Sequence, residues 1–267
     1  MIYEEGPVSI DEIVITPSTS FSAYVLAQAL RSRWNEGDEL IVAVQNHEAN
    51  SSPWRRLKKF GLKILDWPVH PETGSLETDF LDTLLSTRTR LVAFPHVSNI
   101  IGEINDVAKI TRRVHEAGAL VCVDGVGYAP HRAIKVNDWD VDFYLFSFYK
   151  VFGPHIGCLY GKKELLVDAE NQSHYFFTKE DTAHTINPAG PQHEMIASLA
   201  GIADYFDALA AHHLQSPPRD LESRTAAVFG LISSHEAKIS EKFINFITSK
   251  SDVRLIGPST SDKHKRV

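Results

Sequence analysis

The chain has 267 residues, of which 43% are apolar and 23% are charged, and its formal net charge is −7 at pH 7. This composition is typical of a globular protein, and the length allows one large hydrophobic core or one and a half domains. The negative charge and the lack of a long basic run disfavour nucleic acid and anionic membranes as partners. We expect the basic KHKRV sequence at 263–267 to be a solvated end.

Cysteine usage and hydropathy favour a cytoplasmic protein. Cys122 and Cys158 lie inside the apolar runs ALVCVDG and IGCLYG, which predicts buried, unreactive thiols without a disulfide, and no cysteine–histidine spacing fits a metal site. The N-terminal MIYEEGPVS lacks the cationic start and apolar core of a signal peptide. No apolar run approaches the ~18 residues that span a membrane.

Short runs rich in β-forming residues recur along the chain and are separated, in its first half, by helical patterns. The predicted strands are EIVIT (12–16), ELIVAV (39–44), LKILDW (62–67), LVAFP (91–95), ALVCVD (119–124), DFYLFS (142–147) and IGCLYG (156–161). Most are apolar throughout, as expected for strands covered on both faces. Residues 20–37 and 105–118 have apolar side chains at helical spacing and end at Gly37 and Gly118. This alternation predicts an α/β fold with a mostly parallel seven-stranded sheet.

The second half of the chain departs from this alternation. The runs at 142–147 and 156–161 are too close for a crossover helix, so one of the two strands should be antiparallel to its neighbour. Helices are predicted at 194–213 and about 221–250, joined by the Pro-rich LQSPPRD. The final segment, 253–267, has the pattern of a further strand and turn.

Hydroxyl residues follow the first predicted strand. In an open α/β sheet, ligands bind at the carboxyl ends of the strands. TPSTSFS places Ser18, Thr19 and Ser20 there, at the start of a helix. Such residues are typical helix N-caps, but together with backbone N–H groups they also bind phosphate. The pattern alone leaves both interpretations open.

Other polar residues follow the later strands at the same edge of the sheet. These are His47 after the second strand, Asn99 after the fourth, Asp124 after the fifth, and Ser147, Tyr149 and Lys150 after the sixth. A lone histidine is usually a polar surface or core residue. Asp124 directly follows ALVCV, where a desolvated carboxylate is costly unless it meets a cation. Lys150 lies between apolar runs, where an ammonium group must be paired, reach the surface or lose its charge.

Taken together, these residues match the needs of pyridoxal 5′-phosphate. Its aldehyde requires a lysine for a Schiff base, its protonated ring nitrogen requires a carboxylate, and its phosphate suits a hydroxyl-rich helix start. An imine at Lys150 and a pyridinium facing Asp124 would remove the cost of both charges.

Two motifs carry a family resemblance. VDGVGYAPH at 123–131 and FSFYKVFGPHIGCLYGKK at 146–163 resemble motifs of the class V aminotransferase and cysteine desulfurase family of fold-type I pyridoxal-phosphate enzymes, closest to the cysteine desulfurase-like branch. The resemblance implies a cofactor-binding large domain at 1–215. It implies for 216–267 a helical connection and the start of a small C-terminal domain that is largely missing. Because relatives are homodimers, a homodimer is also implied.

The resemblance assigns catalytic roles to the residues around the cofactor ring. Lys150 would form the internal aldimine and then act as general base and acid. Asp124 would keep the ring nitrogen protonated, and His47 would stack on the ring. Asn99 would hydrogen-bond the phenolic oxygen.

The remaining site residues are assigned to the phosphate. The resemblance implies that Thr19 and Ser20 bind it from the helix start, and that Ser147 and Tyr149 add further contacts. A histidine is common where Tyr149 stands, but a phenol also donates one hydrogen bond.

Departures from the family pattern limit the functional prediction. Relatives often carry glutamine at the position of Gly127, and a desulfurase needs an exposed loop cysteine that neither Cys122 nor Cys158 supplies. We therefore predict transamination or elimination on an amino acid or small amine, rather than genuine desulfuration.

Two alternatives come from other functional classes. The resemblance does not extend to the family's N-terminal arm or to the substrate-binding arginine of the small domain. A second interpretation is therefore a truncated, inactive binding or scaffold protein with the same fold. A dinucleotide-binding domain is disfavoured because no GxGxxG follows the first strand.

Overall fold

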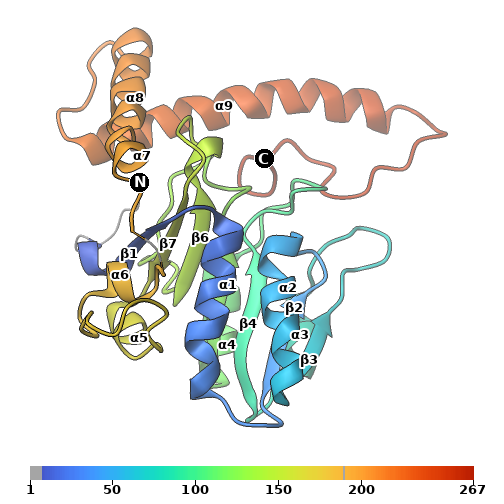
Figure 1. Cartoon of the computed structure of the whole chain (residues 1–267). Helices are drawn as coiled ribbons and strands as arrows, with labels where there is room; N and C mark the ends of the chain where they lie inside the picture. The colour runs from blue at the N-terminus through green and yellow to red at the C-terminus, as the bar shows by residue number, and fades with distance from the viewer. Residues whose placement is uncertain (1–7, 189) are drawn as a thin grey trace.

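We describe residues 8–188 and 190–267 in a computed structural model of the chain, in which helices cover both faces of a seven-stranded sheet (Figure 1). The strands are β1 (Ile13–Thr16), β2 (Glu39–Ala43), β3 (Lys63–Trp67), β4 (Thr89–Pro95), β5 (Leu120–Asp124), β6 (Phe143–Ser147) and β7 (Gly157–Gly161). Their order is β1-β7-β6-β5-β4-β2-β3. Strands β2 to β6 pair in parallel, and β7 is antiparallel to both its neighbours. The predicted sheet is confirmed, and β7 is its antiparallel strand.

The helices divide between the two faces of the sheet and one of its ends. They are α1 (Thr19–Leu30), α2 (Ser52–Arg55), α3 (Thr78–Leu84), α4 (Val107–Glu116), α5 (Lys163–Val167), α6 (Thr182–Thr185), α7 (His193–Ala197), α8 (Ala200–His213) and α9 (Leu221–Thr248). In the described residues, none of the helices is both long enough and apolar enough to cross a membrane.

Buried apolar residues form one core on each face of the sheet. One core packs Leu26 and Leu30 of α1 and Trp54 of α2 against the sheet, and the other packs Ile110 and Val114 of α4 against the opposite face. Every residue of β6 and β7 is buried, which explains why these strands are apolar throughout.

Helices α8 and α9 form a hairpin at one end of the sheet. The long α9 runs across that end (Figure 1). Their contact is a third apolar cluster centred on Phe206 and Phe229, and the Pro-rich 214–220 joins them as predicted. The predicted helix at 194–213 is interrupted, because Ser198 and Leu199 separate α7 from α8. The predicted helix ending at Gly37 is also shorter, since α1 ends at Leu30 and a 3₁₀ turn follows.

The structure corrects the prediction for the final segment. Residues 253–267 form no strand, only an isolated bridge between Arg266 and Glu103. The KHKRV sequence is also not a free solvated end. Its side chains are exposed or half-buried, but its backbone is hydrogen-bonded to 102–104 and to Arg132. The predicted division of the chain at residue 215 stays a prediction.

Candidate active site

A cavity of about 320 Å³ lies at the carboxyl ends of the parallel strands. Its lining consists of Ser18, Thr19, Ser20, His47, Ala49, Pro95, Val97, Asn99, Asp124, Val126, Gly127, Ser147, Tyr149 and Lys150. Every residue that the sequence predicts for the site is in this set. The structure therefore brings together side chains that are up to 132 positions apart in the chain, from Ser18 to Lys150.

One corner of the cavity is the N-terminus of α1. Ser18 is its N-cap, and the Ser18 Oγ accepts a hydrogen bond from the N–H of Phe21 at 3.2 Å. Buried Thr19 and Ser147 are hydrogen-bonded through their hydroxyls at 2.6 Å, which ties the helix start to the end of β6. A Cβ atom at Gly157 of β7 would lie 2.6 Å from the N of Thr19, so only glycine permits this close approach. This corner combines hydroxyls with the backbone N–H groups of a helix start, as an anion site requires.

Asp124 is the buried carboxylate of the cavity. It ends β5, is 4% exposed, and its Oδ1 accepts a hydrogen bond from the N–H of Val126 at 2.9 Å. Burial raises the pKa of Asp124, while that hydrogen bond and the charges of His47 and Lys150 act in the opposite direction. Among the described residues, no ion pair reaches this carboxylate, so a cation in the cavity would stabilise it.

A buried aromatic cluster lies next to Asp124. The sequence analysis did not predict this cluster. The Nδ1 of His96 lies 2.9 Å from the hydroxyl of Tyr144, and its ring stacks on Tyr128 with centroids 3.6 Å apart. The N–H of His96 also donates to the carbonyl of Asp124 at 2.8 Å, and a Cβ atom at Gly125 would overlap the Tyr144 ring. Burial holds the pKa of His96 well below its usual value, so this imidazole is neutral. The one sequence signal was a histidine directly after β4.

His47 and Asn99 line the cavity from loops. His47 follows β2 and is exposed. It is the N-cap of a 3₁₀ turn, and its Nδ1 accepts a hydrogen bond from the N–H of Ala49 at 3.1 Å. Asn99 is also exposed and lies in the loop between the bridged residues Val97 and Ile104. Both side chains are therefore accessible to a ligand.

Lys150 ends a 3₁₀ turn, Phe148–Lys150, directly after β6. The sequence left open whether it reaches the surface, and the structure places it exposed at the cavity. Among the described residues, no hydrogen bond or ion pair holds its ammonium group. Tyr149 is 46% exposed beside it, with its ring 4.9 Å from that of His155. Lys150 is thus an exposed amine at the cavity that can reach a ligand.

The turn after Lys150 is held by helix α8. Phe152 has a left-handed backbone with φ of 62°, which is unfavourable for a bulky side chain. Its ring packs against Tyr205 with centroids 4.8 Å apart, and a Cβ atom at Gly153 would lie 2.7 Å from the Cδ1 of Ile202. Packing on α8 therefore maintains the strained turn that presents Lys150.

The two cysteines are not part of the cavity lining. Both are buried, as predicted; burial raises the pKa of Cys122 well above its usual value and that of Cys158 to about 12. Neither thiol is an accessible nucleophile in this structure.

Comparisons with known proteins identify the fold and the family of the chain. The structure superposes on the apo structure of a cysteine desulfurase from Thermococcus onnurineus NA1 with a TM-score of 0.79 and 25% identity, covering 96% of this chain and 62% of that one. The fold is therefore that of the fold-type I pyridoxal-phosphate enzymes.

Sequence comparison identifies the family within this fold. The chain belongs to the class V aminotransferase family, whose sequence profile matches residues 8–244. It is 36% identical to the aminotransferase-like protein FGM3 of Gibberella zeae, over 97% of this chain and 61% of that protein. It is 35% identical to the cysteine desulfurase-like protein ustD of Aspergillus flavus, over 96% of this chain and 57% of that protein. The chain thus spans about three fifths of the length of these relatives.

Proposed function

We propose that the protein is a pyridoxal-phosphate-dependent enzyme that acts on an amino acid or a small amine, with Lys150 as the attachment point of the cofactor. The observation that supports this proposal is the meeting of an exposed lysine, a buried carboxylate and a hydroxyl-rich helix start around one cavity. When bound, the cofactor would supply an aldehyde for the lysine and an electron-accepting ring.

The residues of the cavity fit each part of this cofactor. Asp124 is buried and has no ion pair within residues 8–188 and 190–267, and the proton of a pyridinium nitrogen would supply the missing cation. Thr19 and Ser20, at the N-terminus of α1, offer hydroxyl and backbone donors to a dianionic phosphate. His47 and Asn99 are exposed in flanking loops, where we assign them to the ring face and the phenolic oxygen.

The roles of the chain's own residues follow from these positions. Lys150 would take and return a proton at Nζ when its amine is free, and Asp124 would hold a proton on the ring nitrogen. Thr19 and Ser147 share a hydrogen bond and so would orient the phosphate end as one unit. Because both cysteines are buried, we favour transamination or elimination over sulfur transfer through Cys122 or Cys158.

Replacing Lys150 tests the assignment directly. The purified chain mixed with pyridoxal phosphate should show a visible absorption band, and borohydride should then fix a pyridoxyl group on the peptide containing Lys150. Lys150→Ala should lose both signals, because no other amine lines the cavity in the described part of the chain. Lys163→Ala is the matched control, since Lys163 is half-exposed and pairs only with Asp11 at 2.6 Å among the described residues.

The outcomes separate the competing functions. A band that survives Lys150→Ala refutes the assignment of the lysine. A band in the native chain without turnover of any amino donor favours an inactive binding protein. No band from a folded chain overturns the cofactor proposal, and a scaffold protein with the family fold becomes the better interpretation.

Two finer predictions accompany the proposal. We propose a homodimer, because members of the family are often dimeric, and sedimentation equilibrium would measure its mass. A cytoplasmic location stays a prediction from the sequence.

A further inference from the structure

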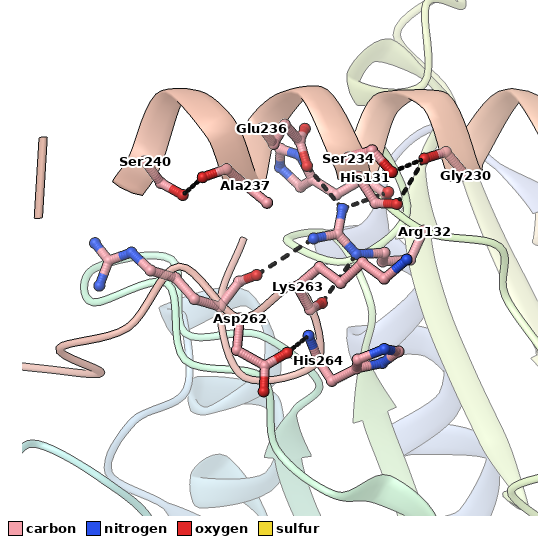
Figure 2. Close-up of polar contacts among 12 residues, drawn as sticks. His131, Arg132, Gly230, Ser234, Glu236, Ala237, Ser240, Asp262, Lys263 and His264 are labelled. Carbon is pink, nitrogen blue, oxygen red and sulfur yellow. Dashed lines mark hydrogen bonds and ion pairs between the residues drawn. The ribbon is translucent and has the colours of Figure 1, made fainter. Parts of the chain in front are cut away.

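The side chain of Arg132 connects three segments that are distant in the chain (Figure 2). It is 12% exposed, and its Nη1 donates at 2.7 Å both to the Oε2 of Glu236 on α9 and to the carbonyl of His131. Its Nε donates to the carbonyl of Lys263 at 3.2 Å, and its Nη2 to that of Arg266 at 3.3 Å. A guanidinium group serves all these acceptors at once because its donors form a planar fork.

The segment that Arg132 holds is in turn paired with one wall of the cavity. The N–H of Ile104 donates to the carbonyl of Lys265, and the N–H of Val267 to that of Gly102, both at 3.0 Å. Residues 97–104 form a tight loop closed by a bridge between its two ends. This loop carries Asn99 at the cavity, so residues 263–267 brace the Asn99 loop from outside.

Arg132 also closes the loop that forms the neighbouring wall. This loop begins after Asp124 and lines the cavity with Val126 and Gly127. Successive turns fold it back, with the N–H of Ala129 donating to the carbonyl of Gly125 at 2.9 Å and the N–H of Arg132 to that of Tyr128 at 3.2 Å. The Arg132 side chain therefore links the Asp124 loop to α9 directly and to the Asn99 loop through residues 263–267.

We propose that Arg132 is a positioning residue of the cavity, which holds the Asn99 loop and the Asp124 loop in the arrangement that binds the cofactor. The identity of the ligand in this inference rests on the proposed function, whereas the bracing of the loops by Arg132 does not. Glu236 of α9 holds the guanidinium group in place. The same carboxylate also contacts His131, with the Nδ1 of His131 2.5 Å from the Oε1 of Glu236. Without this link, the Asn99 loop would lose its outer brace and sample arrangements that do not bind.

The test replaces Arg132 with lysine in the full chain. Arg132→Lys keeps the charge but reaches at most a part of the acceptors. In the cofactor-free protein, hydrogen exchange at the N–H of Ile104 should become about tenfold faster, since its partner segment is released. The Kd for pyridoxal phosphate, from absorbance titration, should rise about tenfold if the competent loop arrangement falls to one tenth of the population.

Arg224→Lys is the matched control. Arg224 is 17% exposed, pairs with Asp207 on α8, and donates to the carbonyls of Pro218 and Arg219, so it has the same kind of network away from the cavity. Its replacement should leave both the exchange at Ile104 and the Kd within twofold of the native values. Glu236→Gln is a milder second variant, which should move both quantities in the same direction as Arg132→Lys and keeps the test valid if that variant does not fold.

Each result has a defined meaning. Faster exchange at Ile104 together with weaker cofactor binding supports the inference. Unchanged exchange, or faster exchange with an unchanged Kd, overturns it. An equal change in exchange and Kd in Arg224→Lys would also overturn it. If the native chain binds no pyridoxal phosphate, the proposed function fails on its own, while the exchange measurement still shows whether Arg132 braces the loop.

Discussion

Two buried aspartates at opposite ends of the adjacent strands β5 and β6 have opposite surroundings. Asp124 ends β5 at the cavity, and Asp142 precedes β6 at the far end of the sheet; they are 4% and 3% exposed. Among the described residues, the Asp124 side chain accepts one hydrogen bond and forms no ion pair. Asp142 accepts from the N–H of Val121 at 2.7 Å and from His115 at 2.9 Å, and its other oxygen lies 3.2 Å from the Nζ of Lys162.

The difference separates a carboxylate that the fold itself pairs from one that is left available to a ligand. Burial of a carboxylate costs free energy that partners must offset, and Asp142 has partners on both oxygens. For Asp124, part of the free-energy cost of burial is not offset in the folded chain, and a cationic ligand would offset it. Equal burial therefore gives no indication of role, whereas incomplete pairing beside a cavity does.

Asp142→Asn should produce the largest change in stability. The amide cannot satisfy His115 and Lys162 together, and breaking a buried ion pair costs about 3 kcal/mol at the lower end of the known range. For a chain of this size we expect the Tm to fall by about 6–12 °C in calorimetry. Asp66→Asn is the control, because Asp66 pairs with Arg55 in the open, being 60% exposed, and such pairs contribute less than about 1 kcal/mol. Equal losses in the two variants would erase the contrast between buried and exposed pairs.

Asp124→Asn should have a smaller effect of the opposite sign. Asparagine keeps the acceptor for Val126 and removes the uncompensated charge, so the free energy of unfolding should rise by about 0.5–2 kcal/mol at pH 7. If the proposed cofactor binds in the cavity, its affinity should also fall, because the ring nitrogen would lose its anionic partner.

The pH dependence of the Asp124→Asn gain sharpens the prediction. Burial raises the pKa of Asp124 above its ordinary value of 3.8, so the folded state binds the proton more tightly than the unfolded state does. The native chain's disadvantage is therefore complete above the folded pKa and disappears as the pH falls through it. Denaturant melts at a series of acidic pH values should show the gain shrinking; a loss of stability at pH 7 would contradict the comparison.

The sheet and the cavity were predictable because each depends on local sequence. Apolar runs bounded by turn residues define the strands, and the carboxyl ends of parallel strands necessarily share an edge. The position of Lys150 after the FYLF strand was enough to place it at that edge. Its exposure was not predictable, since the strained turn at Phe152 depends on contact with α8.

Features that depend on distant segments could not be read from the sequence. The strand-like pattern of 253–267 gave the wrong structure because its backbone finds partners in 102–104 and Arg132 rather than in a sheet. The hydrogen bond of His96 with Tyr144 likewise joins the residue after β4 to a residue of β6, and a histidine directly after an apolar strand does not identify its partner.

The smallest predicted effect is the pH dependence of the Asp142 site. The hydrogen bond to Asp142 raises the pKa of His115 above its ordinary value of 6.5, although burial opposes this. His115 is partly exposed, so its contribution should be below about 1 kcal/mol; it is complete below pH 6.5 and is lost as the pH rises through the folded pKa. Because the buried, neutral His96 acts in the opposite direction, we compare the native chain with His115→Gln, in which the His96 contribution cancels. The stability difference between the two proteins should shrink from pH 6 to pH 8.5 in denaturant melts; a constant difference would show that Asp142 is held without help from the charge on His115.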